Sequence, residues 1–367
     1  MDIWFAANIP EDSYGGVGRS MRELSEGLKK CGYRTTIVFG DTGMLGCNYL
    51  VFALKLCVRL LANVGNPPAW IIARSTDGVL CAAAVKILRL KTKVALHNHG
   101  WEEYAYEMEQ KLPRTVISSP TSWKARVLRF PLLRASLLLC DCCLSGTLFE
   151  TRWLARRYPR LRKKMRYLPN GVGARQDQYW PKDREAPLNI LAVGGLTWKK
   201  NIEHSIAVFN RIADRMPEAG LFLIGAGFNK GDAPQVLKDL WRDKEERIVV
   251  VPEEKPEHMS KWYTQCPFVI SSSRFEGGHS LVILEALSYG CVVFATDLPS
   301  TKEIISHAGN GILIGGVSAE DDAKVIIDMV DKKDPLANIR QNAYRTARRN
   351  RWERQVGRLE DILCMKQ

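Results

Sequence analysis

The sequence has no apolar run of the length that a membrane-spanning helix requires. The most apolar segment, residues 45–64, is interrupted by Asn48, Lys55 and Arg59, whereas a span needs about 20 predominantly apolar residues. This segment is therefore predicted to be a core or surface helix. The N-terminus also lacks the basic flank of a secretory signal, since residues 1–4 lead directly into a strand-like run. Both absences favour a cytoplasmic protein.

Paired metal-ligand spacings are missing as well, although the chain of 367 residues contains 10 cysteines. Cys140, Cys142 and Cys143 lie close together, but in an apolar stretch, residues 136–144, that is predicted to be a strand. Packing explains them better than a metal does. Without a secretory signal, the cysteines indicate the reduced thiols of a cytosol. Zinc-finger, helix-turn-helix and RNA-binding patterns are also absent, which counts against a nucleic-acid-binding protein.

Positive charge is abundant, but only in one half of the chain. The net charge is +13; residues 1–180 hold 27 Lys and Arg against 14 Asp and Glu, and residues 181–367 hold 26 against 26. The whole excess therefore belongs to the first half. Nucleic acid, an anionic membrane surface or an acidic substrate would each be attracted by it.

Strands and helices alternate along the chain, which is too long for one ordinary core. Strand-like runs at 69–73 and 93–96 are separated by a helical segment near 78–90, and the alternation begins again at 188–193. This order predicts two doubly wound domains with parallel sheets. The polar, proline-bearing residues 173–187 are predicted to link the domains.

The most specific pattern lies between Ser271 and Gly290. An apolar run at 281–289, ended by Gly290, predicts a buried helix with Ser280 as its N-cap. Glu285 interrupts this run, and a buried carboxylate must accept hydrogen bonds to be tolerated.

A second carboxylate precedes this helix. Glu276 lies nine positions before Glu285, and the four residues after it lead to the helix start, where free backbone amides favour an anion. Two carboxylates on either side of an anion site would suit a ligand with hydroxyl groups at both ends and phosphate in the middle. A nucleotide sugar has this layout. The candidate anion-binding residues are Gly277, Gly278, His279 and Ser280.

These residues resemble the Glu-x7-Glu signature of the retaining GT-B glycosyltransferases of family 4, with a spacing one residue longer. The resemblance implies that Glu276 contacts the donor sugar and that Glu285 holds the ribose. It also implies two Rossmann-like domains that face a cleft. Residues 1–175 would bind the acceptor, residues 186–345 would bind the nucleotide sugar, and a helix in 346–367 would cross back to the first domain.

Other segments carry the same resemblance. Gly16, in the turn at 15–18, matches a glycine loop that lines the family's cleft. His99 follows the strand at 93–96 and matches a histidine near the transferred sugar. Residues 169–172 (PNGV) match the motif that closes the first domain. His97 and His99 have a spacing that could suggest metal, but no third ligand is evident.

Diphosphate binding is implied by the glycine-rich segment after the strand at 188–193. Lys200 falls on the family lysine that contacts the diphosphate. Gly195 stands where the family has arginine, so Arg274 or Lys199 would have to supply the missing charge.

The resulting hypothesis is a metal-independent retaining glycosyltransferase, with no cofactor besides its nucleotide-sugar co-substrate. The acceptor would be a glycan or lipid-linked glycan of lipopolysaccharide, capsule or exopolysaccharide synthesis. The basic first half predicts a peripheral enzyme on the inner face of the cell membrane, with no nucleic-acid partner. Its candidate lipid contacts are Arg156, Arg157, Lys163, Lys164 and the basic residues within 111–134.

Two alternatives remain open. One is different chemistry on the same fold, such as an epimerase or a phosphorylase, which a lysine carrying a covalent cofactor, or transfer to phosphate, would reveal. The other is a basic nucleic-acid-binding protein, which salt-dependent oligonucleotide binding without nucleotide-sugar hydrolysis would reveal.

Overall fold

A computed structural model describes residues 1–11, 13, 15–40, 49–112, 125–173, 188–229, 231, 233–241 and 243–365. The chain divides into two compact units. Unit 1 consists of Met1–Tyr106, Thr121–Gly171 and Trp352–Gln367, and unit 2 of Glu107–Pro120 and Val172–Arg351. Most of the expected linker at 173–187 lies outside the described residues, as do Arg114 and Lys124 of the proposed basic contacts.

Unit 1 is built on a six-stranded sheet whose strands all pair in parallel, in the order β2-β1-β3-β4-β5-β6. The central strands are buried almost throughout, as expected for a sheet covered on both faces. The strands are β1 (Asp2–Ala7), β2 (Arg34–Phe39), β3 (Trp70–Arg74), β4 (Lys93–Asn98), β5 (Cys142–Ser145) and β6 (Met165–Tyr167).

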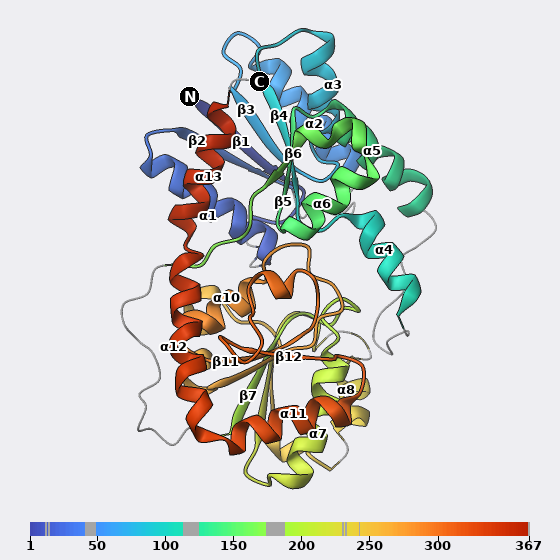
Figure 1. The fold of residues 1–367 in the computed structure, drawn as a ribbon. Coiled ribbons are helices and arrows are strands. Elements are labelled where there is room, and N and C mark those ends of the chain that lie inside the picture. The colour runs from blue at the N-terminus through green and yellow to red at the C-terminus, as the bar shows by residue number, and fades with distance from the viewer. Residues whose placement is uncertain are drawn as a thin grey trace. The chain divides into compact units, whose positions relative to one another are not determined.

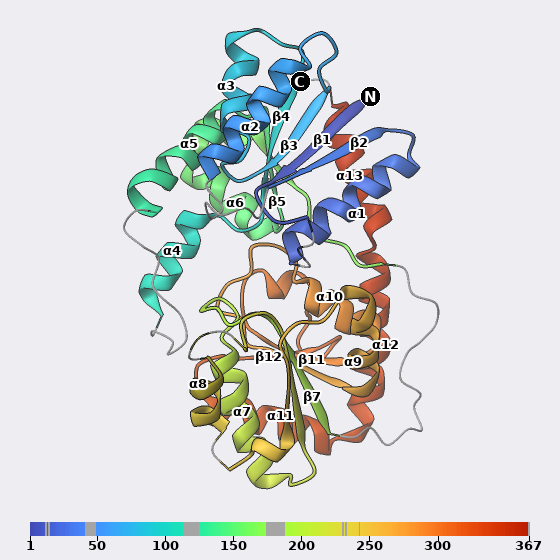
Figure 2. The same ribbon diagram turned by 180° about the vertical axis from the view of Figure 1, so that it is seen from behind.

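Helices cover both faces of this sheet. In Figures 1 and 2, α2, α3 and α5 lie on one side, and α1 and α13 lie on the other. The helices of this part of the chain are α1 (Gly16–Lys30), α2 (Tyr49–Ala62), α3 (Val79–Ile87), α4 (Glu102–Lys111), α5 (Phe130–Leu139), α6 (Leu148–Arg157) and α13 (Trp352–Cys364), with a π-helical turn η1 (Ala125–Arg129) before α5 and a 3-10 helix η2 (Pro159–Lys164) after α6.

The last helix, α13, is packed tightly on α1. A Cβ added at Gly27 of α1 would lie 2.2 Å from Cγ2 of Val356, so only glycine allows this approach. The Tyr33 hydroxyl donates to Glu360 Oε1 at 2.7 Å. These contacts tie the C-terminal end of the chain to unit 1.

The strand predicted at 136–144 is wrong, because its first part is helical. Helix α5 runs to Leu139, and β5 begins only at Cys142. Leucine, alanine and arginine favour a helix, and a short apolar run has no period that separates strand from helix. Lys164 fixes the end of this helix, since its ammonium donates to the carbonyls of Leu138 and Cys140, both at 2.6 Å.

Unit 2 contains a second six-stranded parallel sheet, in the order β12-β11-β10-β7-β8-β9. The predicted pair of parallel sheets is therefore confirmed. Its strands are β7 (Asn189–Val193), β8 (Gly220–Ile224), β9 (Ile248–Val251), β10 (Phe268–Ser271), β11 (Val292–Thr296) and β12 (Ile312–Ile314). Its helices are α7 (Ile202–Arg215), α8 (Ala233–Trp241), α9 (Met259–Gln265), α10 (Leu281–Ser288), α11 (Ala319–Asp331) and α12 (Lys333–Arg349), with 3-10 helices η3 (Glu245–Arg247), η4 (Pro256–His258) and η5 (Thr301–Glu303).

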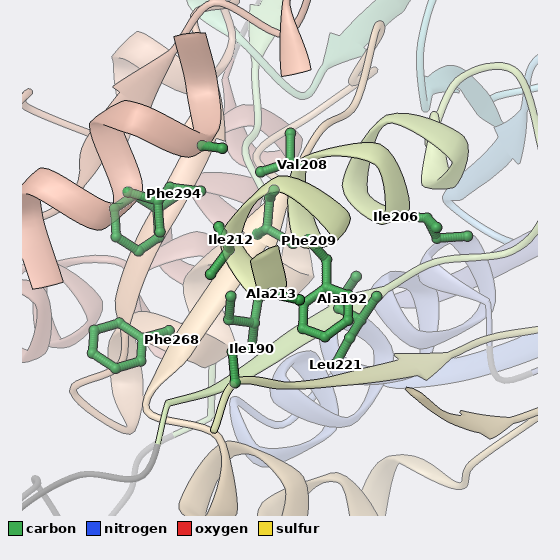
Figure 3. Close-up of a cluster of buried hydrophobic side chains, with 14 of the residues drawn as sticks. Ile190, Ala192, Ile206, Val208, Phe209, Ile212, Ala213, Leu221, Phe268 and Phe294 are labelled. Atoms are coloured by element: carbon green, nitrogen blue, oxygen red, sulfur yellow. The ribbon is translucent and has the colours of Figure 1, made fainter. Parts of the chain in front are cut away.

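Both faces of this second sheet are buried. On one face, Ile190 and Ala192 of β7 pack against Phe209 and Ile212 of α7 (Figure 3). Leu191, which points to the opposite face, belongs to a second apolar cluster. Within the described residues, no helix is both long enough and apolar enough to cross a membrane.

Candidate functional site

In unit 2, Lys200 and Glu276 follow adjacent strands, β7 and β10, at the carboxyl edge of the sheet. Ligands bind at this edge in open α/β sheets. The Lys200 ammonium lies 2.6 Å from Glu276 Oε1, and the Ser273 hydroxyl donates to the same oxygen at 2.7 Å. The structure thus brings together two residues that lie 76 positions apart.

The loops that carry these two residues are joined through their backbones. The Arg274 amide donates to the Lys199 carbonyl at 2.7 Å, and the Ser272 hydroxyl donates to the Asn201 carbonyl at 2.8 Å. Gly194 leaves room for the lysine stem, because a Cβ there would lie 3.0 Å from Lys200 Cγ. The loop therefore holds the backbone of Lys200, and Glu276 holds its ammonium.

The candidates for the missing arginine are placed differently from Lys200. The Lys199 ammonium lies over the Phe275 ring, 5.1 Å from its centre, a cation–π arrangement. Burial lowers the pKa of the Arg274 guanidinium, opposed by the charge of Glu203. A Cβ at Gly195 would lie 3.2 Å from the Ala226 carbonyl oxygen, which is a tight contact with the backbone.

Helix α10 begins beside this loop, one residue after Ser280. The hydroxyl of Ser280 forms no cap to the helix; it is buried and has no hydrogen-bond partner among the described residues. The helix ends one residue earlier than predicted, with Gly290 in a left-handed conformation and the paired bonds Gly290 N to Leu287 O and Cys291 N to Ala286 O. As at the start of any α-helix, its first amides have no partner within the helix, and such amides can bind an anion.

Glu285 is buried inside this helix, and its partner was not predicted. The Tyr263 hydroxyl donates to Glu285 Oε2 at 2.9 Å, and the Tyr263 ring stacks on Tyr289 with centroids 5.2 Å apart. Tyr263 lies on α9, 22 positions earlier in the chain, and no local pattern connects the two. His279 is also buried, with Nε2 3.3 Å from Glu303 Oε2.

In unit 1, His97 and His99 lie at the carboxyl end of β4 with ring centroids 4.1 Å apart. Burial lowers the pKa of His97 to about 4. Burial, with smaller effects of His97 and Arg74, lowers the pKa of His99 well below its usual value. Both rings are therefore neutral at pH 7. Among the described residues, His99 Nε2 and His97 Nδ1 have no hydrogen-bond partner.

Other polar residues at this edge were missed. Ser75 has a left-handed φ of 47°, and its hydroxyl donates to Glu102 Oε1 at 3.1 Å. Asp77 accepts from the Asn8 amide at 2.8 Å, and burial raises the pKa of Asp77 to about 6 against the lowering effect of that bond. These residues follow β3 directly, so the rule that ligands bind at the carboxyl ends of strands could have found them.

Glu103, in contrast, serves the fold. Its carboxylate accepts from Arg134 Nε at 2.6 Å, Tyr158 OH at 2.6 Å and Trp101 Nε1 at 3.1 Å. Gly16 opens α1, after the N-cap Gly15. In the part of the chain that the structure describes, no group of three or more His, Cys, Asp or Glu is arranged to hold a metal ion.

Family models match both parts of the chain. The model "Glycosyltransferase Family 4" matches residues 14–175, and "Glycosyl transferases group 1" matches residues 176–346. Among curated relatives, the GDP-mannose:cellobiosyl-diphosphopolyprenol alpha-mannosyltransferase of Xanthomonas campestris is 22% identical over 204 residues, 54% of this chain and 52% of that protein. The chain spans about half or less of the length of the curated relatives that it matches.

Solved structures match the whole chain. Sucrose-phosphate synthase from Thermosynechococcus elongatus gives a TM-score of 0.78 at 16% identity, with 98% of each chain covered. HepE of Anabaena, solved in complex with UDP-glucose, gives 0.75 at 16% identity, with 99% of each chain covered. At this identity, the similarity establishes the GT-B fold.

Proposed function

The chain belongs to glycosyltransferase family 4, and on that premise we propose that it transfers a hexose from a nucleotide sugar to a glycan acceptor with retention of configuration. The observation that carries this proposal is the cluster of Lys200, Glu276 and Ser273 at the carboxyl edge of the unit 2 sheet. It combines a cation for a diphosphate with a carboxylate for sugar hydroxyls.

The donor diphosphate would be bound by Lys200, by Arg274 and by the first amides of α10. When the bond between sugar and phosphate breaks, negative charge grows on the diphosphate, and fixed donors stabilise that charge. The buried hydroxyl of Ser280, with Gly277, Gly278 and His279 before it, lies at this helix start. These groups would supply the stabilisation without a metal ion.

Sugar and ribose would be held by different carboxylates. Glu276 would orient the hexose hydroxyls, and Glu285, with one oxygen fixed by Tyr263, would accept from the ribose. On unit 1, neutral His99 would accept or donate one hydrogen bond to the sugar, and Gly16 would border the donor. The acceptor hydroxyl would then attack the anomeric carbon while its proton passes to the departing diphosphate oxygen.

The acceptor would be a lipid-linked glycan of surface polysaccharide synthesis, bound by unit 1 at an anionic membrane. All of the +13 excess lies in residues 1–180, and the Xanthomonas relative is named for a diphosphopolyprenol acceptor. Arg156, Arg157 and Lys163 are exposed. Lys164 is a poorer candidate, because it is engaged by the carbonyls at the end of α5.

A donor screen tests the proposal. The chain is incubated separately with UDP-glucose and GDP-mannose, and the release of nucleoside diphosphate and the anomeric configuration of the freed sugar are measured. One donor should be hydrolysed slowly with retention. If no donor is hydrolysed and none raises the melting temperature, the proposal is wrong.

Glu285→Gln should weaken donor binding by roughly 1–3 kcal/mol, because the amide presents only one oxygen and no charge to the ribose. Calorimetric titration with the nucleoside diphosphate measures this loss. Tyr263→Phe is the matched control for the buried network, since it removes the hydrogen bond to Glu285 and keeps the ring that stacks on Tyr289. Wild-type affinity in a folded Glu285→Gln protein would assign Glu285 to structure alone.

His99→Ala should lower turnover by roughly 10–100-fold while the dissociation constant of the diphosphate product stays within about twofold. The reason is that His99 is proposed to contact the sugar rather than the nucleotide. Because burial depresses the pKa of His99, wild-type turnover should show no histidine titration between pH 6 and pH 8 from this residue. Undiminished transfer by the variant would exclude His99 and direct attention to His97.

A further inference from the structure

Helix α2 has apolar side chains on two opposite sides, and the core uses only one of them. Phe52, Leu56 and Leu60 are buried against the sheet. On the other side, Leu54 and Val58 are 56% and 57% exposed, and Leu61 is exposed as well. These three follow one another at helical spacing, so they form a stripe along the outer side of α2.

The helices beside α2 expose apolar side chains too. Ile87 and Leu88 at the end of α3 are 78% and 50% exposed, and Leu138 of α5 is 59% exposed. Helix α3 contacts both α2 and α5, and the three helices lie on the same side of the unit 1 sheet in both views (Figures 1 and 2). The α2–α5 surface is defined here by Leu54, Val58, Leu61, Ile87, Leu88 and Leu138.

Positive charge predominates around this surface, and its nearest partly exposed acid is Asp141, which follows α5 and pairs with Lys86 of α3. The sequences of α2, α3 and α5 contain no acidic residue, and residues 49–100 hold seven Lys and Arg against one acid, Asp77, which is buried. Lys55, Arg89 and Lys91 are exposed. Lys86, Arg129 and Arg134 do not count toward this charge, because they pair with Asp141, Glu102 and Glu103 at 4.0, 2.8 and 2.6 Å.

We propose that the α2–α5 surface docks the chain on a lipid bilayer with anionic headgroups. Its apolar side chains would enter the interfacial region while Lys55, Arg89 and Lys91 contact lipid phosphates. A second copy of this chain fits less well, because a self-complementary contact would bring the same positive charges together. The inference rests on the lipid-linked acceptor of the proposed function, and it names the surface that reaches that acceptor's membrane.

Vesicle co-sedimentation with the full chain tests the apolar contribution. The vesicles are phosphatidylcholine with or without phosphatidylglycerol. Leu54→Gln combined with Val58→Gln should lower the partition onto anionic vesicles at least about tenfold, because both side chains lose their favourable burial. Val249→Gln combined with Val317→Gln is the matched control, since these exposed valines lie on unit 2. It should bind as the wild type does.

The electrostatic contribution has its own variant. Arg89→Gln combined with Lys91→Gln should reduce binding to anionic vesicles about tenfold at low salt. The difference from the wild type should shrink as salt is raised, because salt screens exposed charges. Melting temperatures should stay unchanged in all variants, since every substituted side chain is exposed.

Two outcomes would overturn the inference. The first is that the Leu54/Val58 variant binds vesicles as the wild type does. If neutralising Arg156 and Arg157 then releases the chain from vesicles, the membrane contact lies at those arginines and not at the α2–α5 surface. The second is a dimer in solution that the same Leu54/Val58 variant dissociates.

Donor hydrolysis is measured in parallel without lipid. Hydrolysis without vesicle binding rejects this surface and leaves the donor chemistry intact, whereas vesicle binding without hydrolysis rejects the proposed function alone.

Discussion

Replacing Lys200 by alanine is expected to weaken binding of the nucleoside diphosphate by about 30-fold, or about 2 kcal/mol. The backbone of Lys200 is held by its loop, and its ammonium is held 2.6 Å from Glu276 Oε1. A charge held in this way loses little conformational entropy when a diphosphate binds. The free nucleoside lacks the phosphates, so its affinity should change by less than about twofold.

Lys199→Ala is the matched comparison for Lys200→Ala. The two lysines are adjacent and carry the same charge, but the Lys199 ammonium lies over the Phe275 ring. Its removal should therefore cost the diphosphate complex much less affinity. Isothermal titration of both variants with the diphosphate and the nucleoside gives four numbers. If Lys200→Ala loses affinity equally for the diphosphate and the nucleoside, Lys200 does not lie in the phosphate site. If Lys199→Ala loses as much diphosphate affinity as Lys200→Ala, the effect comes from the overall positive charge and not from a specific contact of Lys200.

The fold was largely predictable because its determinants are local. The order of strand, glycine turn and helix repeats along the chain. Gly290, predicted to end a helix, has the positive φ that is typical of a glycine at this position. The error at residues 136–144 arose where local information was weakest. A short apolar segment of this kind fits a helix and a buried strand equally well, and the contact that fixes the helix end comes from Lys164, far outside that window.

The candidate site was only partly predictable, for the opposite reason. Glu276, Lys200 and Glu285 each have a local signature, but their partners do not. Tyr263 reaches Glu285 across the core, and Lys200 reaches Glu276 from 76 positions earlier in the chain. Such contacts depend on how elements pack, which the sequence does not display. The same holds for Lys199 and Lys200: their difference in direction follows from the space that Gly194 leaves and from the Phe275 ring.

The contact between Lys200 and Glu276 leads to the second large effect. Glu276→Gln should lower turnover at least about 100-fold, because it removes the charged partner of the sugar hydroxyls, which is needed most when the sugar becomes cationic. The same change frees the Lys200 ammonium from its ion pair. Affinity for the nucleoside diphosphate should therefore rise, by about twofold to fivefold, since breaking an ion pair of this kind costs about 1 kcal/mol or less.

These opposite signs separate two roles that Glu276 can have. If it only positioned Lys200, Glu276→Gln would lower turnover and diphosphate affinity together, and the Lys200→Ala, Glu276→Gln double variant would bind diphosphate no worse than Lys200→Ala. If it contacts the sugar, turnover collapses while diphosphate affinity is kept or raised. The gain in affinity should then vanish in the double variant, because it depends on the freed lysine. Turnover is measured in single-turnover assays with the nucleotide sugar that the donor screen identifies, and affinity by titration with the diphosphate. Both measurements are made on the wild type, the two single variants and the double variant, and together they distinguish the two roles.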